Sequence, residues 1–184
     1  LRVAARKMAE TIFMALMGTI FSVIVTIPLS FFGAKNLMGG SDAGLAAYGA
    51  TRSVMNVLRS IEVLIVGLMM VRAVGIGPFA GVLALAIHGV GALGKLYSEA
   101  IESIDPGPIE AITATGATRF QVVMFGVVPQ IVPQFVAFTF YRWDINVRMA
   151  TVIGLVGGGG IGFILKEYID LLQWPQAGTA ILLI

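Results

Sequence analysis

The sequence predicts an all-α integral membrane protein, and three observations support that fold class. Hydrophobic residues make up 58% of the 184 residues, and the mean hydropathy is +0.94. Charged residues make up 12%, about half of their share in a typical soluble domain. Two runs, Thr11–Phe32 and Phe120–Tyr141, contain no charged residue, and each is long enough as a helix to cross a hydrocarbon core of about 30 Å.

The composition also excludes several classes of function. The chain has no cysteine, so disulfides and thiolate metal sites are excluded. The net charge of +2 is small and scattered, unlike the basic surface of a protein that binds nucleic acid. Because the chain starts at Leu1 and stops inside an apolar run, we expect it to be truncated at both ends.

The first half of the chain contains three predicted membrane-spanning helices. The first is Thr11–Phe32, with Pro28 in its last turns, where neighbouring helices can tolerate a kink. The second is Val54–Val74, and the glycines that follow it break the chain. The third is Pro78–Gly94, with the proline in the first helical turn, where it is favoured.

The second half contains three further apolar segments. The fourth span is Phe120–Tyr141, interrupted by Pro129 and Pro133. The fifth segment, Met149–Leu165, is broken in its middle by glycines, and the sixth, Ala177–Ile184, is the start of another helix. Together the six segments predict about five to six transmembrane helices.

The segment Lys95–Arg119 differs from its neighbours because it is rich in ionisable groups. The turn Asp105–Pro108 divides it into two short pieces, each amphipathic at helical spacing. Gly116 is suited to end the second piece in a left-handed conformation. We therefore predict two short helices around a turn that form a docking element rather than a span. The alternative is a solvated loop.

The residues around this segment resemble a known motif. Glu110 and Ala111 are followed by Gly116, six residues after the glutamate, and by Pro129, thirteen residues further on. This spacing resembles the "EAA" loop of ABC importer permeases, the cytoplasmic surface on which such a permease docks its ATPase. Three positions depart from the general pattern and remain apolar: Ile112, Gly126 and Val128.

Longer stretches resemble the phosphonate branch of these permeases, the PhnE type. They are Val71–Gly81, Phe138–Arg148 and Gly154–Gly162. Glu10 and the residues up to Thr19 resemble the usual start of the importer core. The resemblance covers nearly the whole chain and implies the fold of a type I ABC importer permease with a cytoplasmic coupling-helix loop.

The resemblance also implies an assembly. In this family two permease copies form a homodimer, an ATP-binding cassette ATPase dimer docks on the cytoplasmic side, and an extracytoplasmic phosphonate-binding protein delivers the solute. The chain would be one multi-pass permease domain, residues 1–184, of the bacterial inner membrane, with 95–119 as its docking loop. ATP and Mg²⁺ belong to the partner ATPase, so no cofactor, catalytic residue or metal ligand is expected here. The docking residues implied are Glu110, Ala111, Gly116, Arg119 and Pro129.

The docking loop fixes the expected orientation, because it must be cytoplasmic. Counting spans back places Lys35 and Arg52 in a cytoplasmic loop, as the positive-inside rule predicts. The same count places Arg2, Arg6 and Lys7 outside, against that rule. Where the two indications conflict, we expect the orientation that the docking loop requires.

Three charged residues flank the expected extracytoplasmic end of the fourth span. They are Arg142, Asp144 and Arg148, of which the last two are four residues apart and can pair along a helix. A guanidinium binds the oxygens of a phosphonate in bidentate fashion. We therefore expect Arg142 or Arg148 to line the route of the anion. The alternative is a structural ion pair or a contact with the binding protein.

Four consecutive glycines interrupt the fifth segment: Gly157, Gly158, Gly159 and Gly160. Each costs about 1 kcal/mol relative to alanine in a helix, and non-helical backbone at membrane depth must be buried or line a cavity. We expect Gly157–Gly162 to form part of the translocation path or its gate. The alternative is close helix packing through glycine pairs that start at Gly154 and Gly158.

Further ionisable residues lie within the predicted spans. Arg59 and Glu62 are three residues apart, so we expect them to share a helix face and pair inside the bundle. His88, the only histidine, is expected to hold a neighbouring helix by a hydrogen bond.

Other functions fit the sequence less well. Gly89–Lys95 matches most of a phosphate-binding P-loop, but Leu96 stands where Ser or Thr must bind Mg²⁺. A secondary transporter predicts paired repeats, which we do not find. An intramembrane enzyme needs a nucleophile–base pair or a metal site, and a chain with one histidine and no cysteine fits neither well. Among ABC importers, methionine and alkanesulfonate are the alternative solutes.

Overall fold

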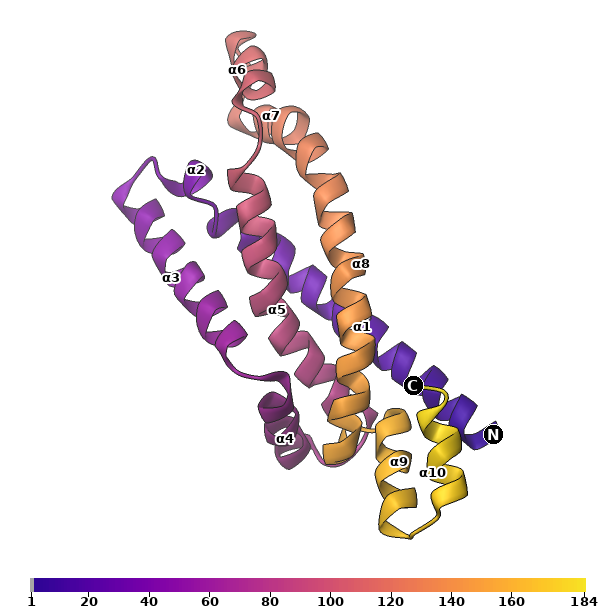
Figure 1. Ribbon diagram of the computed structural model, residues 1–184. Coiled ribbons are helices and arrows are strands. Elements are labelled where there is room, and N and C mark those ends of the chain that lie inside the picture. The colour runs from indigo at the N-terminus through magenta and orange to yellow at the C-terminus, as the bar shows by residue number, and fades with distance from the viewer. Residues whose placement is uncertain (1) are drawn as a thin grey trace.

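The computed structural model describes residues 2–184, and every regular element in that range is helical. In chain order the elements are α1 (Arg2–Phe32), α2 (Lys35–Met38), α3 (Asp42–Ser60), α4 (Val63–Val74), α5 (Pro78–Glu102), α6 (Pro106–Ala114), α7 (Arg119–Val122), η1 (Val123–Val127), α8 (Val128–Ile153), η2 (Gly154–Gly158), α9 (Gly160–Asp170) and α10 (Trp174–Ile181). The long helices α1, α3, α5 and α8 run between two ends of the molecule (Figure 1). At one end α6 and α7 project beyond the bundle, and at the other lie α4, α9 and α10.

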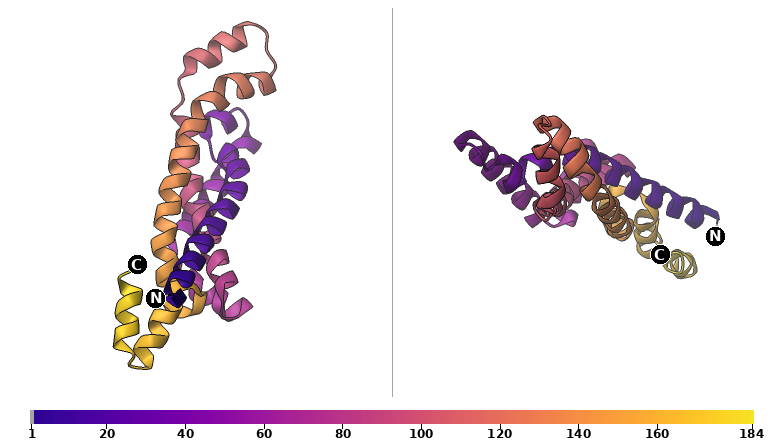
Figure 2. Two further views of the ribbon diagram at one scale, coloured as in Figure 1. Left: turned by 90° about the vertical axis from the view of Figure 1, so that its right-hand side faces the viewer. Right: turned by 90° about the horizontal axis from the view of Figure 1, so that it is seen from above.

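The described residues contain fewer membrane spans than the sequence predicted. Three helical segments are long and apolar enough to cross a membrane: α1, α5 and the stretch Arg119–Gly158, which contains α8. The bent pair of α3 and α4 makes a fourth only if it is counted as one span. The two C-terminal helices, α9 and α10, have 11 and 8 residues and are too short to span. They form a hairpin beside the end of α8 (Figure 2).

The predicted second span, Val54–Val74, is not one straight helix, because the chain turns sharply in its middle. Helix α3 ends at Ser60, α4 begins at Val63, and the two helices are bent by 89°. The residues between them have extended backbone torsions, so the helix cannot continue. The bend places α4 across the end of the bundle (Figure 1).

This bend separates Arg59 from Glu62, which were predicted to pair, and it gives His88 a hydrogen-bond partner. Arg59 and Glu62 do not share a helix face, and no ion pair joins them among the residues that the structure describes. The ring Nδ1 of His88 lies 3.1 Å from the carbonyl oxygen of Ile61, within hydrogen-bond distance. His88 on α5 therefore holds the bend, which confirms its expected structural role.

Helices α1 and α5 approach closely because small and polar residues lie between them. Gly18 and Ser22 of α1 are buried, whereas Phe13 and Ile24 on the opposite face are 63% and 61% exposed. A Cβ atom added to Gly18 would lie 2.7 Å from the Cβ of Leu85. Small residues inside and large apolar residues outside are typical of helices surrounded by lipid.

We predict that Gly18→Ala destabilises the protein, although alanine favours a helix. The added methyl group must push α1 away from Leu85, at a cost of about 1–3 kcal/mol. The melting temperature in detergent should fall. Gly49→Ala on α3 is the matched control, because nothing lies within 4 Å of its added Cβ. Equal melting temperatures for the two variants would contradict the close packing of α1 and α5.

The fourth span is longer than the predicted Phe120–Tyr141. A helical stretch runs from Arg119 through the π-helical segment η1 and α8 into η2, where the non-helical torsions of Gly157 end it. Pro129 lies in the first turn of α8, where its missing N–H is tolerated, and Pro133 lies inside the helix. Arg142 therefore lies in the interior of the span and not at its end.

The fifth segment is not a span, because the chain leaves the α8 axis at the glycines. Gly157, Gly159 and Gly160 have φ values of +100°, +82° and +73°, which side chains rarely allow. The new helix, α9, begins at Gly160. The predicted sixth segment lies within and just after α10.

Candidate functional site

The ionisable segment 95–119 contains one short helix and not two. Its first piece is continuous with α5, which ends at Glu102 and whose last turns are buried against the bundle. Its second piece is the predicted short helix, α6. Asp105 begins this helix, since its side chain accepts a hydrogen bond of 2.9 Å from the N–H of Gly107.

The predicted docking residues gather at the projecting end of the molecule (Figure 1). Glu110 and Ala111 lie on α6, and both are exposed. Gly116 has a φ of +80°, which confirms the left-handed turn expected there. Arg119 begins α7, and Pro129 lies in the first turn of α8. Both are exposed, so all five residues are available to a partner.

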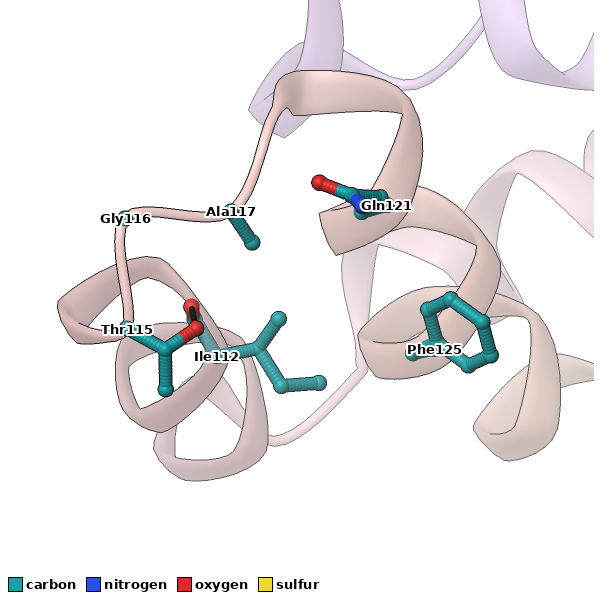
Figure 3. A pocket seen from close by; sticks show the side chains of 6 residues that line it. All are labelled: Ile112, Thr115, Gly116, Ala117, Gln121 and Phe125. Carbon is teal, nitrogen blue, oxygen red and sulfur yellow. Dashed lines mark hydrogen bonds between the residues drawn. The ribbon is translucent and has the colours of Figure 1, made fainter.

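A groove of about 500 Å³ opens between α6 and α7 (Figure 3). It is lined by Ile112, Thr115, Gly116, Ala117, Gln121 and Phe125. Thr118 and Gln121 form a capping box that starts α7 directly after the turn. Phe125 is 69% exposed and Phe120 is 74% exposed. Exposed aromatic residues beside a groove are typical of a surface that meets a partner.

Two contacts attach α6 to the start of the fourth span. A Cβ added to Gly126 would lie 3.4 Å from side-chain atoms of both Ile109 and Ile112, so glycine lets α6 lie close to η1. Gln130 supplies the polar contact. Its Oε1 accepts from the N–H of Asp105 (2.9 Å), and its Nε2 donates to the carbonyls of Asp105 (3.2 Å) and Gly126 (2.7 Å). Gln130 was not among the residues expected from the sequence.

Arg142 lies inside the bundle beside polar residues of α1 and α8. Arg142 is 5% exposed, and its Nε and Nη2 are buried without a hydrogen-bond partner among residues 2–184. Asn146, one turn along α8, donates to the Oγ1 of Thr19 at 2.9 Å, and its own Oδ1 has no partner. Ser22 donates to the carbonyl of Ala86 at 3.0 Å. We refer to Arg142, Asn146, Thr19 and Ser22 as the polar seam.

Gly89 of α5 makes room for this seam. A Cβ added there would lie 4.0 Å from the Nε of Arg142 and would collide with the Oγ of Ser22. A buried guanidinium inside a membrane span is costly and marks a functional candidate. Asn146 was not among the residues expected from the sequence, and its i, i+4 spacing from Arg142 on one helix face is the signal that could have identified it. Thr19 and Ser22 could be placed only by the packing of α1.

Asp144 and Arg148 are separated from Arg142. They form an ion pair with an N–O distance of 2.7 Å, and both side chains are 66% exposed. This is the structural pair that the sequence offered as the alternative. They do not join the polar seam, and a role in the route of the anion stays a prediction for them.

The four glycines are buried in packing contacts. A Cβ added to Gly159 would lie 2.8 Å from the nitrogen of Pro78, the first residue of α5. The N–H of Gly160 donates to the carboxylate of Glu10 at 3.1 Å, and the N–H of Ile161 donates to the Oγ1 of Thr11 at 2.8 Å. These contacts bury the glycines against α1 and α5. That Gly157, Gly158, Gly159 and Gly160 line the path stays a prediction.

The sequence matches one known protein family over most of its length. Residues 37–184 match the model of a family described as the binding-protein-dependent transport system inner membrane component. The chain belongs to this family. The family is described as a membrane component of transport systems and not as an enzyme.

Two similar proteins are permeases of phosphite and phosphonate transport systems. The chain is 40% identical over 179 residues to the phosphite transport system permease protein PtxC of Stutzerimonas stutzeri, an alignment that covers 97% of the chain and 64% of that protein. It is 49% identical over 102 residues to PhnE2, a permease protein proposed for a cryptic phosphonate transport system of Escherichia coli (strain K12). That alignment covers 55% of the chain and 84% of the protein. The chain thus spans less than two thirds of the length of the phosphite permease.

A solved structure confirms the type I permease fold. The inward-facing MetNI methionine ABC transporter superposes with a TM-score of 0.79 at 26% sequence identity, covering 89% of this chain and 79% of that chain.

Proposed function

We propose that this chain is a permease subunit of an ATP-driven importer for phosphonates or related phosphorus oxyanions. The observation that carries the proposal is the exposed α6–Gly116 docking unit on a chain of a binding-protein-dependent transport family. The names of the similar phosphite and phosphonate permeases support the class of solute.

The partners follow from this function. An ATPase dimer would dock on α6 and supply ATP and Mg²⁺, so the permease itself needs no cofactor. A second copy of the permease, an extracytoplasmic phosphonate-binding protein and the bacterial inner membrane, crossed in several passes, complete the assembly. A short helix in a groove of the ATPase transmits displacement as a rigid body, which switches the side on which the path is open.

We assign Arg142 to the route of the anion. Its guanidinium is buried and unpaired, and the Oδ1 of neighbouring Asn146 also lacks a partner. A phosphonate offers oxygens that match a guanidinium fork in bidentate fashion, which would compensate the buried charge. Asp144 and Arg148 already compensate one another and are the weaker candidates.

ATP hydrolysis by the reconstituted complex tests the proposed function. The permease is placed in lipid with its ATPase and its binding protein, and hydrolysis is measured with 2-aminoethylphosphonate, phosphite, methionine or an alkanesulfonate. We expect the phosphorus oxyanions to stimulate hydrolysis. Stimulation by methionine or the sulfonate alone would retain the importer and discard the solute. Failure to associate with any ATPase would refute the importer itself.

A further inference from the structure

We propose that Gln130 is the positioning residue that couples movement of α6 to α8, an inference that rests on the proposed function. Its side-chain amide matches both peptide groups of Asp105, accepting from the N–H at 2.9 Å and donating to the carbonyl at 3.2 Å. Asp105 is the N-cap of α6. The contact therefore holds the docking helix at its N-terminal cap.

No other hydrogen bond joins α6 or Asp105 to another element among residues 2–184. The remaining contact, of Ile109 and Ile112 with η1, is apolar. Apolar contacts have no direction and allow sliding, whereas two hydrogen bonds from one planar amide fix both distance and orientation. Gln130 therefore determines how α6 is oriented on the start of the fourth span.

The backbone around Gln130 is poorly able to hold α6 by itself. Segment η1 is π-helical, and Pro129 and Pro133 remove two amide donors from the first turns of α8. The Nε2 of Gln130 also donates to the carbonyl of Gly126 at 2.7 Å, which ties η1 to α8. One side chain thus connects the docking helix, the π-helical turn and the long helix.

Beyond this junction α8 is continuous and leads to the polar seam. The ring of Phe135 stacks on Tyr97 of α5 with ring centroids 3.8 Å apart, and Arg142 and Asn146 follow on the same helix. A shift of α8 at Gln130 would therefore move Arg142 relative to α1. That is the displacement that alternating access requires of a residue on the route.

The test uses Gln130→Leu, which keeps the size of the side chain and removes its polar contacts. Gln134→Leu is the matched control, since Gln134 lies one turn further on α8, is exposed and makes no side-chain hydrogen bond with any of residues 2–184. In the assembled complex we expect Gln130→Leu to raise the ATP hydrolysed per solute imported by about tenfold, as the loss of two coupled hydrogen bonds allows. Gln134→Leu should keep the wild-type ratio.

A second readout does not depend on the solute. The chain has no cysteine, so Leu155→Cys in η2 reports on the far end of α8 through its rate of maleimide labelling. We expect ATP with vanadate to change this rate in the wild-type background and not with Gln130→Leu. If the change persists with Gln130→Leu, the coupling role is refuted, whatever the solute proves to be.

Gln130→Glu keeps only the acceptor of the side-chain amide. It should give a ratio of ATP hydrolysed to solute imported between those of the wild type and Gln130→Leu. A wild-type ratio for both Gln130 variants would also overturn the proposal.

Discussion

Replacing Arg142 by methionine should nearly abolish solute uptake without destabilising the folded protein. The guanidinium is buried without a hydrogen-bond partner for its Nε and Nη2, so no intramolecular ion pair is lost. An apolar side chain of similar length in place of a buried charge is commonly neutral or stabilising. Losing the charge that meets the anion should cost about 2–5 kcal/mol, which reduces uptake by about 30-fold or more.

Paired measurements of uptake and melting temperature separate the functional role from a structural one. A residue that merely holds the bundle together would lose stability and activity in parallel. Arg148→Ala is the comparison, because it breaks an exposed ion pair with Asp144 that contributes only about 0–1 kcal/mol. We expect it to leave uptake close to wild type. Normal uptake by Arg142→Met would refute the assignment of Arg142 to the route.

Gly116→Pro should eliminate the stimulation of ATP hydrolysis by the loaded binding protein. Proline cannot adopt the φ of +80° observed here, and it also lacks the N–H that donates to the carbonyl of Thr113 at 3.0 Å. The turn after α6 would have to open, which displaces the groove and the start of α7. Hydrolysis by the reconstituted complex, with and without loaded binding protein, measures this effect.

Gly116→Asn is the matched control for this variant. Asparagine tolerates the left-handed conformation, and nothing lies within 4 Å of an added Cβ at this position. We expect it to keep most of the stimulation. Equal losses in the two variants would show that the partner contacts this position directly and that the turn geometry is not the cause.

The docking turn could be predicted from the sequence because its causes are local. Gly116 needs no distant partner to adopt a positive φ, and the Asp105 cap and its following prolines define the start of α6. The bend after Ser60 had no such signal, since neither glycine nor proline marks it. The carbonyl of Ile61 in the bend is hydrogen-bonded by His88 of another helix, a contact that only the tertiary structure reveals.

The interior of the bundle was harder to predict for a related reason. Pro129 and Pro133 suggested an interrupted span, yet the helix continues, and Arg142 moves from the expected membrane boundary to the polar seam. The N–H groups of Gly160 and Ile161 donate to Glu10 and Thr11, each 150 residues away in the chain. Spacing within one helix cannot show which residues of another helix will face it.

The most direct test of the account is accumulation of labelled 2-aminoethylphosphonate in proteoliposomes that hold the permease with its ATPase. Accumulation should require both internal ATP and external binding protein, and it should be lost with Arg142→Met and kept with Arg148→Ala. Accumulation driven by an ion gradient without ATP would contradict the importer mechanism. Failure to accumulate any phosphorus oxyanion, in a complex that hydrolyses ATP in response to another solute, would contradict the proposed solute.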